Sequence, residues 1–316
     1  MRICIMDDLE GVALGSADWS VLEGVDELLA LDRHFHDEVE LAGILERFDV
    51  IVVQRERTRI GRSLLERLPS LRLLVTTGPF NAAIDLAACA DLGITVSATS
   101  MGGGAVVELA WALILGALRD VPARDLSMRS GEWAPVPGRS LPGLRLGLLG
   151  LGNTGTRMAR IAAAFDMEVV AWSENLTAEV ARERGATLVS RRELFATSDV
   201  ISVHLVLSAR TRGLVVDDDL RAMKPDAWLV NTSRGPIVDE DALIRACRDG
   251  VIAGAALDVF DQEPLPPDHA LRRLPNTVLT PHVGYVTTET FRVWFGEVVE
   301  DIAAFAAGSP VRVLSA

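Results

Sequence analysis

Cysteine is scarce in this sequence. The three that occur, Cys4, Cys89 and Cys247, lie far apart, and each sits in an apolar segment. They form neither a metal-ligand spacing nor a redox pair, so the pattern excludes a cysteine-based metal or disulfide-exchange site. We expect three buried free thiols, because free cysteine usually behaves as a small apolar residue.

Positive charge and long apolar runs are scarce as well. The chain has 31 Lys and Arg against 44 Asp and Glu, a formal net charge of −13. An acidic surface repels phosphate backbones, which argues against a nucleic-acid partner. The longest apolar run, 109–118, is too short to span a bilayer, and the run 1–6 is too short for a signal peptide. We therefore expect no membrane partner and a cytoplasmic location.

The composition present is that of a globular protein with more than one core. Of the 316 residues, 49% are hydrophobic and 24% are charged, and this length exceeds what one core usually organises. Short apolar runs alternate with amphipathic stretches, which predicts parallel sheets covered by helices on both faces. The predicted strands are 3–6, 50–53, 73–76, 95–97, 146–149, 168–172, 200–204, 228–231, 253–257 and 278–280. The predicted helices are 61–67, 84–91, 105–118, 154–165, 178–184, 240–249 and 289–306.

A segment rich in Gly and Pro, 130–138, separates two sets of alternating strands and helices. Gly and Pro mark loops, so a second set of βαβ units is expected to begin near Arg145. The first set begins at Arg2.

A glycine motif follows the first strand of the second set. Residues 150–155 read Gly-Leu-Gly-Asn-Thr-Gly and lie between a predicted strand and a predicted helix. Gly150 permits a tight turn, Gly152 lets the backbone approach a pyrophosphate, and Gly155 allows close packing of helix on strand. The context favours a dinucleotide site over an ordinary glycine-rich turn, with Asn153 and Thr154 opening the helix at the phosphates.

The end of the next strand bears on the choice of nucleotide. An acidic residue normally stands there to hold the adenine ribose. Here Ser173 stands in its place and Glu174 follows, while the first nearby cation is Arg182. Glu174 would repel a 2′-phosphate, so the sequence favours NAD and leaves NADP open.

Three later segments place polar residues just after apolar strands, at Arg234, Glu263 and His282. Ligand sites in open α/β sheets lie outside the carboxyl ends of the strands. Hydride transfer at C2 of a 2-oxo acid needs an Arg to hold the carboxylate, a His to pass the proton and a carboxylate to support the imidazole. Each residue alone is more often structural or simply exposed, but the three together indicate this chemistry.

With these segments in place, the chain resembles the D-isomer-specific 2-hydroxyacid dehydrogenase family over essentially its whole length. The resemblance depends on the segments 150–155, 230–235, 256–260, 263–264 and 280–284. It implies an NAD(P)-dependent oxidoreductase that acts on a small 2-keto or 2-hydroxy acid. Glyoxylate, hydroxypyruvate, pyruvate-like acids and branched analogues are the candidate substrates.

The resemblance also implies roles for single residues. Arg234 matches the family's substrate-binding arginine, Glu263 the acid paired with the histidine, and His282 the proton donor. The residues implied at the cofactor are Gly150, Gly152, Asn153, Thr154, Gly155, Ser173, His204, Thr232 and Asp258, with Asp258 near the nicotinamide carboxamide.

Two segments of the N-terminal part resemble those that meet the substrate. Arg55 and the turn beginning with Thr77 and Gly78 match them, and backbone N–H groups of the turn are implied to bind the carboxylate. Arg55 is equally well explained as an exposed cation in the run Arg55-Glu56-Arg57.

The implied fold is α/β with two Rossmann-like lobes. A flavodoxin-like substrate lobe of residues 1–100 and 284–316 is expected to be interrupted by an inserted, doubly wound NAD(P)-binding lobe of residues 101–283. The implied assembly is a homodimer formed through 105–140, and we interpret Trp133 as an interface residue rather than one reaching the partner's site. The glycine run 102–104 is interpreted as a hinge, because Gly absorbs dihedral change at low cost.

Two alternatives stay open at this point. One is a phosphonate- or formate-type dehydrogenase of the same superfamily, of which the formate type is disfavoured because Glu263 stands where that relative has Gln. The other is a non-enzymatic NAD-sensing protein on the same fold, disfavoured because His282 is present. No metal site is expected.

Overall fold

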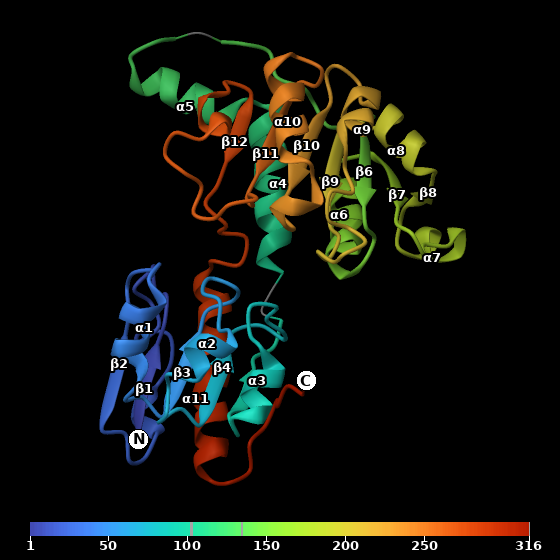
Figure 1. Ribbon diagram of the computed structural model, residues 1–316. Coiled ribbons are helices and arrows are strands. Elements are labelled where there is room, and N and C mark those ends of the chain that lie inside the picture. Colours follow the sequence, from blue (N-terminus) through green and yellow to red (C-terminus); the bar gives the residue numbers. More distant parts are fainter. Residues whose placement is uncertain (102–103, 134, 316) are drawn as a thin grey trace. The chain divides into compact units, whose positions relative to one another are not determined.

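A computed structural model describes residues 1–101, 104–133 and 135–315 (Figure 1). The chain forms two compact units, one of residues 1–103 and 286–316 and the other of residues 104–285. The expected boundaries at 100/101 and 283/284 differ from this division by two or three residues. Of the glycine run interpreted as a hinge, Gly102 and Gly103 lie outside the described residues.

The first unit contains a five-stranded parallel sheet in the order β2-β1-β3-β4-β5. This is the flavodoxin-like order, with its topological switch between β1 and β3. The first three helices share a hydrophobic cluster with the sheet, while α11 contacts β4. The strands are β1 (Arg2–Ile5), β2 (Glu27–Ala30), β3 (Val50–Val53), β4 (Leu73–Thr76) and β5 (Thr95–Ala98), and the helices are α1 (Glu38–Leu45), α2 (Arg62–Leu65), α3 (Leu86–Asp91) and α11 (Thr288–Ala306).

The second unit contains a seven-stranded parallel sheet in the order β12-β11-β10-β9-β6-β7-β8. Its order reverses between β6 and β9, which is where a doubly wound sheet opens a ligand crevice. The strands are β6 (Arg145–Leu149), β7 (Glu168–Trp172), β8 (Thr187–Leu188), β9 (Val200–Val203), β10 (Trp228–Asn231), β11 (Gly254–Leu257) and β12 (Thr277–Leu279). The helices are α4 (Ala105–Leu118), α5 (Val121–Arg129), α6 (Asn153–Ala164), α7 (Ala178–Glu183), α8 (Arg191–Thr197), α9 (Asp217–Ala222) and α10 (Glu240–Arg248).

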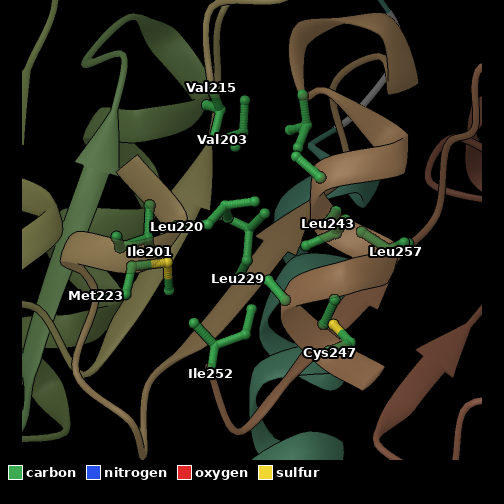
Figure 2. Close-up of a cluster of buried hydrophobic side chains, with 14 of the residues drawn as sticks. Ile201, Val203, Val215, Leu220, Met223, Leu229, Leu243, Cys247, Ile252 and Leu257 are labelled. Atoms are coloured by element: carbon green, nitrogen blue, oxygen red, sulfur yellow. The ribbon is translucent and has the colours of Figure 1, made fainter. Parts of the chain in front are cut away.

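Hydrophobic clusters cover both faces of the seven-stranded sheet. Leu229 of β10 belongs to the cluster shown in Figure 2, and its neighbour Val230 belongs to the cluster on the other face. Leu257 and Ala256 of β11 divide between the two clusters in the same way. Successive side chains of a strand point to opposite faces, so a strand buried on both faces has to be apolar throughout. This rigid double-covered sheet fixes the positions of the loops at its carboxyl edge.

The α/β prediction is confirmed, and each of the ten predicted strands is present within one residue at either end. Strands β2 and β8 were not predicted. Both are edge strands, β2 is only partly buried, and β8 has two residues, so neither gives a strong apolar signal. Helices α1, α5, α8 and α9 were also missed; α5 has no buried residue and therefore no apolar face to detect.

The three cysteines are free and buried, as predicted. Burial raises the pKa of Cys4 and Cys247 to about 12 and that of Cys89 to about 11, so all three remain unreactive thiols at neutral pH. Among the described residues, no helix combines the length and apolar character needed to cross a membrane.

Candidate active site

The glycine motif forms the turn between β6 and α6. Gly150 has φ +102°, and a Cβ on it would lie 2.6 Å from the carbonyl oxygen of His204. A Cβ on Gly155 would lie 2.4 Å from the carbonyl oxygen of Gly150. Only glycine fits at these two positions, because the turn and the helix pack directly on neighbouring backbone. The motif therefore brings the helix start close to the switch point between β6 and β9.

Gly152 differs from the other two glycines because the space beside it is open. No atom lies within 4 Å of the Cβ that a side chain would place there. Gly152 is the N-cap of α6 and provides no side-chain cap, and Asn153 and Thr154 are the first residues of the helix. The uncapped N–H groups and the positive end of the helix dipole suit an anion that approaches through this opening.

Two further residues expected at the cofactor line the adjoining strand ends. Thr232, after β10, is 7% exposed, and its buried hydroxyl has no hydrogen-bond partner within the described structure. His204, after β9, contacts the hydroxyl of Ser202 through Nε2 at 2.9 Å. Burial lowers the pKa of His204 to about 4, so this ring is neutral. An unpartnered hydroxyl and an open glycine cradle fit a bound dinucleotide.

The end of β7 is where the ribose was expected. Ser173 is partly exposed there, and Glu174 is fully at the surface. The guanidinium of Arg184, rather than Arg182, reaches back to donate to the carbonyl of Leu151 in the glycine turn. Arg182, the first cation after Ser173 in the sequence, is therefore not the one that contacts the glycine turn. The spacing of the residues gave no indication of this.

His282 and Glu263 form a close acid–base pair. Nδ1 of His282 lies 2.5 Å from Oε2 of Glu263, and Oε1 of Glu263 accepts a hydrogen bond from the N–H of Phe260 at 2.9 Å. Burial raises the pKa of Glu263, but the contacts with His282, the Phe260 N–H and the charge of Arg234 outweigh it and lower that pKa overall. Glu263 is therefore ionised at neutral pH and favours a proton on the imidazole. Both side chains are about one-third exposed, at 29% for His282 and 33% for Glu263.

Arg234 lies in the loop after β10 in an extended conformation. Its Nη1 donates to the carbonyl of Ser233 at 2.7 Å, and its own carbonyl accepts from Nδ2 of Asn231 at 3.0 Å. Asn231 also accepts from the N–H of Ser233 at 3.0 Å. Asn231 ends the strand and hydrogen-bonds to the backbone of both Ser233 and Arg234. It therefore fixes the point at which the Arg234 side chain leaves the loop.

Asp258 holds the loop that carries His282. Oδ1 accepts from the hydroxyl of Thr280 at 2.6 Å and the N–H of Val283 at 2.8 Å, and Oδ2 accepts from the N–H of Gly284 at 2.9 Å. Burial raises the pKa of Asp258, and these donors partly offset that effect. Both oxygens thus serve the loop, where His282 takes the left-handed φ of +55°. Asp258 therefore orients the loop that carries His282, whether or not it also contacts a nicotinamide.

Tyr285, the one tyrosine of the chain, packs against His282. The ring centroids are 5.8 Å apart and the planes cross at 73°, an edge-to-face arrangement. Nothing in the sequence indicated this contact. The three-residue spacing in an irregular loop gives no periodicity from which this contact follows.

The substrate residues expected in the first unit are also found at strand ends. The guanidinium of Arg55 lies over Gly78, which has φ +84°, and Nη1 is 3.3 Å from the carbonyl of Thr77. The N–H of Thr77 donates to Val53, and the N–H of Gly78 donates to the hydroxyl of Thr99 at 2.7 Å. These two N–H groups are therefore already bonded within the unit, so a carboxylate would have to compete for them.

In the described parts of the chain, no group of three or more His, Cys, Asp or Glu side chains is arranged to hold a metal ion. The second unit instead carries an Arg, a His and a Glu in the loops at the carboxyl edge of its sheet, and the open glycine turn lies at the same edge.

Comparison with known proteins gives this arrangement a family. The family model "D-isomer specific 2-hydroxyacid dehydrogenase, NAD binding domain" matches residues 111–284. Glyoxylate reductase of Aeropyrum pernix is 40% identical over 260 residues, which cover 79% of this chain and 78% of that enzyme. D-3-phosphoglycerate dehydrogenase of Archaeoglobus fulgidus is 36% identical over 278 residues, 86% of this chain but 52% of that enzyme.

Among solved structures, phosphoglycerate oxidoreductase from Vibrio cholerae has a TM-score of 0.92 and 36% identity, with 98% of this chain and 100% of that chain covered. The expectation of an enzyme rather than a non-enzymatic sensor is confirmed. The chain is an NAD(P)-dependent oxidoreductase acting on the CH–OH group of donors, and it belongs to the D-isomer specific 2-hydroxyacid dehydrogenase family.

Proposed function

We propose that this enzyme interconverts a small 2-oxo acid and its D-2-hydroxy acid, with His282, Glu263 and Arg234 as its catalytic residues. The observation that carries the proposal is the 2.5 Å contact between Nδ1 of His282 and Oε2 of Glu263. A carboxylate held at Nδ1 leaves Nε2 to exchange a proton with the substrate oxygen.

The three side chains divide the work by charge. Arg234 binds the substrate carboxylate, because a guanidinium matches a carboxylate in shape and charge. His282 donates a proton to the C2 oxygen during reduction and removes it during oxidation. Glu263 stays ionised and stabilises the imidazolium before the transfer. The bound nicotinamide supplies or accepts the hydride.

The residues of this chain that would hold the cofactor are those of the glycine cradle and the strand ends. Gly152 leaves an opening for the pyrophosphate at the start of α6, and the buried hydroxyl of Thr232 has no hydrogen-bond partner among the described residues. We assign Ser173, His204 and Asp258 to the same cleft, and we expect NAD to be preferred over NADP because Glu174 follows Ser173.

The substrate is proposed to be a short 2-oxo acid such as glyoxylate or hydroxypyruvate. The curated relatives act, by their names, on glyoxylate or on D-3-phosphoglycerate. We further propose that Arg55, Thr77 and Gly78 contribute to substrate binding from the first unit.

We propose a homodimer formed through α5 and the loop after it. Leu126 and Met128 of α5 and Trp133 and Val136 after it expose 54–82% of their surface, and exposed apolar patches are typical of protein–protein interfaces. A cytoplasmic location is proposed with it.

The test follows oxidation of NADH and NADPH in parallel against a panel of 2-oxo acids. Turnover that His282→Ala reduces by about 100-fold or more supports the assignment, the range expected for a general acid. Nucleotide binding without turnover of any acid would contradict it.

A further inference from the structure

The loop after β3 carries charges of alternating sign, Arg55-Glu56-Arg57. It follows a fully buried strand, so its position in the first unit is fixed. The proposed function places Arg55 at the substrate, and the inference below rests on that proposal. How these three charges are paired then decides which substrates the loop tolerates.

Arg57 is committed to a carboxylate of its own unit. Nη2 lies 2.5 Å and Nη1 2.9 Å from the two oxygens of Glu10, a bidentate pair. Nη1 also donates to the carbonyl of Asp7 at 2.6 Å. Bidentate guanidinium–carboxylate pairs are the strongest of their kind, so this positive charge is balanced before any substrate arrives.

Arg55 is committed to the neighbouring turn. Nη1 lies 3.3 Å from the carbonyl of Thr77 and 3.4 Å from that of Phe80, and the guanidinium carbon lies 5.7 Å from the Phe80 ring centroid. Its Nη2 is 3.4 Å from Oε1 of Glu56. The side chains of Arg55 and Glu56 are 14% and 24% exposed, so the carboxylate of Glu56 is the more accessible of the two charges.

Arg55 and Arg57 are therefore matched by Glu56 and Glu10, and the third arginine of the loop, Arg59, is exposed. A phosphate group carries about −1.5 to −2 charges at neutral pH and binds where arginines cluster without such counter-ions. We infer that this enzyme acts on unphosphorylated 2-oxo acids, and that Glu56 is the specificity-determining residue that rejects a phosphate at the far end of the substrate.

Two substrates that differ only by the phosphate test the inference. The reductions of hydroxypyruvate and of 3-phosphohydroxypyruvate are followed with NADH, and the ratio of their kcat/KM values is compared between enzymes. For the natural chain we expect hydroxypyruvate to be favoured by about 30-fold or more. In Glu56→Gln the preference for hydroxypyruvate should shrink by about 10-fold. The reason is that a carboxylate facing the phosphate repels it, and removing that repulsion should improve use of the phosphorylated acid by about this factor.

The matched control is Glu27→Gln. Glu27 opens β2 at the amino edge of the same sheet and pairs with Arg47 at 2.6 Å. This variant removes the same charge from the same unit, so it should leave the ratio unchanged. Equal or better use of the phosphorylated acid by the natural chain, or an equal change of the ratio in both variants, would overturn the inference.

Binding separates a failure of this inference from a failure of the proposed function. Calorimetric titration of the NADH-loaded enzyme with D-glycerate and with 3-phospho-D-glycerate needs no turnover. If no 2-oxo acid is reduced but D-glycerate binds more tightly than 3-phospho-D-glycerate, the proposed function falls while the discrimination against phosphate by Glu56 stands. Tighter binding of the phosphorylated acid overturns the inference alone, and heat from neither overturns both.

Discussion

At the carboxyl edge of the seven-stranded sheet one carboxylate–histidine pair is partly open to solvent, whereas at the same edge of the five-stranded sheet the two aspartates that follow β1 are buried. His282 and Glu263 are 29% and 33% exposed, while Asp7 and Asp8 are 2% and 3% exposed. Asp7 accepts from Thr58 at 2.7 Å and contacts His34 at 3.0 Å. Both edges thus hold an Asp or Glu beside a His, so residue types alone do not mark the reactive pair.

What distinguishes the two edges is the set of groups that surrounds each pair. In the second unit Glu263 lies within reach of the charge of Arg234, and the open glycine turn lies at the same carboxyl edge of the sheet. In the first unit, Asp7 lies among donors of its own fold, and Thr58 contacts the same histidine nitrogen at 3.4 Å. A carboxylate–histidine pair is therefore a catalytic candidate only when its surroundings bind a substrate and a cofactor.

The largest expected effect comes from replacing one glutamate by glutamine at the carboxyl edge of each sheet and comparing the two variants. Glu263→Gln should lower kcat by about 100-fold with little change in stability, because a neutral amide no longer favours the imidazolium. Glu10→Gln, which breaks the pair with Arg57, should leave kcat within about 3-fold and lower the unfolding free energy by about 1–3 kcal/mol.

Steady-state kinetics and urea unfolding of both variants measure this contrast. Equal losses of kcat in the two variants would erase the distinction between the edges.

The next effect separates packing from binding within the glycine turn. Gly155→Ala places a Cβ 2.4 Å from the Gly150 carbonyl and should cost about 1–3 kcal/mol of stability. Gly152→Ala meets no atom within 4 Å, so stability should hold while the Kd for NADH rises by about 10-fold. Thermal unfolding and fluorescence titration with NADH measure the two effects, and the reverse pattern would remove Gly152 from the cofactor site.

A third prediction concerns pH and the first unit. Asp301 is fully buried on α11, and burial, only partly offset by Arg312, raises its pKa to about 7. An unfolded Asp has a pKa of about 3.9, so the folded state binds the extra proton between these values and stability falls as pH rises from about 4 to about 7.

In Asp301→Asn this pH dependence should flatten, as measured by urea unfolding at a series of pH values. Glu297, Glu300 and Arg312 also face this carboxyl, so the control is Glu289→Gln, which removes an exposed carboxylate from the first turn of the same helix and should retain the slope. An unchanged slope in Asp301→Asn would contradict the assignment.

The smallest effect is expected at Tyr285. Its edge-to-face contact with His282 should contribute about 0.5–1.5 kcal/mol, so Tyr285→Ala should lower kcat by roughly 2–10-fold. Tyr285→Phe keeps the ring and should restore most of the rate. Because the chain has one tyrosine, a fluorotyrosine label would give a single ¹⁹F signal, which should shift in His282→Ala if the two rings are in contact.

Much of the fold follows from sequence because buried parallel strands must be apolar throughout, as in Leu229 and Val230. The edge strand Glu27–Ala30 escaped prediction because its residues are only half-buried. The glycine turn could be predicted because positions 150 and 155 have no room for a side chain, and this requirement fixes the spacing of glycines in the sequence. The pairing of Glu263 with His282 could not be derived from their separation of 19 residues and came from the family resemblance. The bonds already made by the Thr77 and Gly78 N–H groups depend on Val53 and Thr99, which only the fold brings near.

The left-handed backbone of His282 has a consequence for how this enzyme varies. A residue with a side chain at φ +55° carries a conformational cost on the order of 1 kcal/mol, which glycine would avoid. A library at position 282 selected for heat resistance should therefore enrich glycine, while the same library selected for turnover should return histidine. The proposed proton donor would then be the residue on which the two selections disagree.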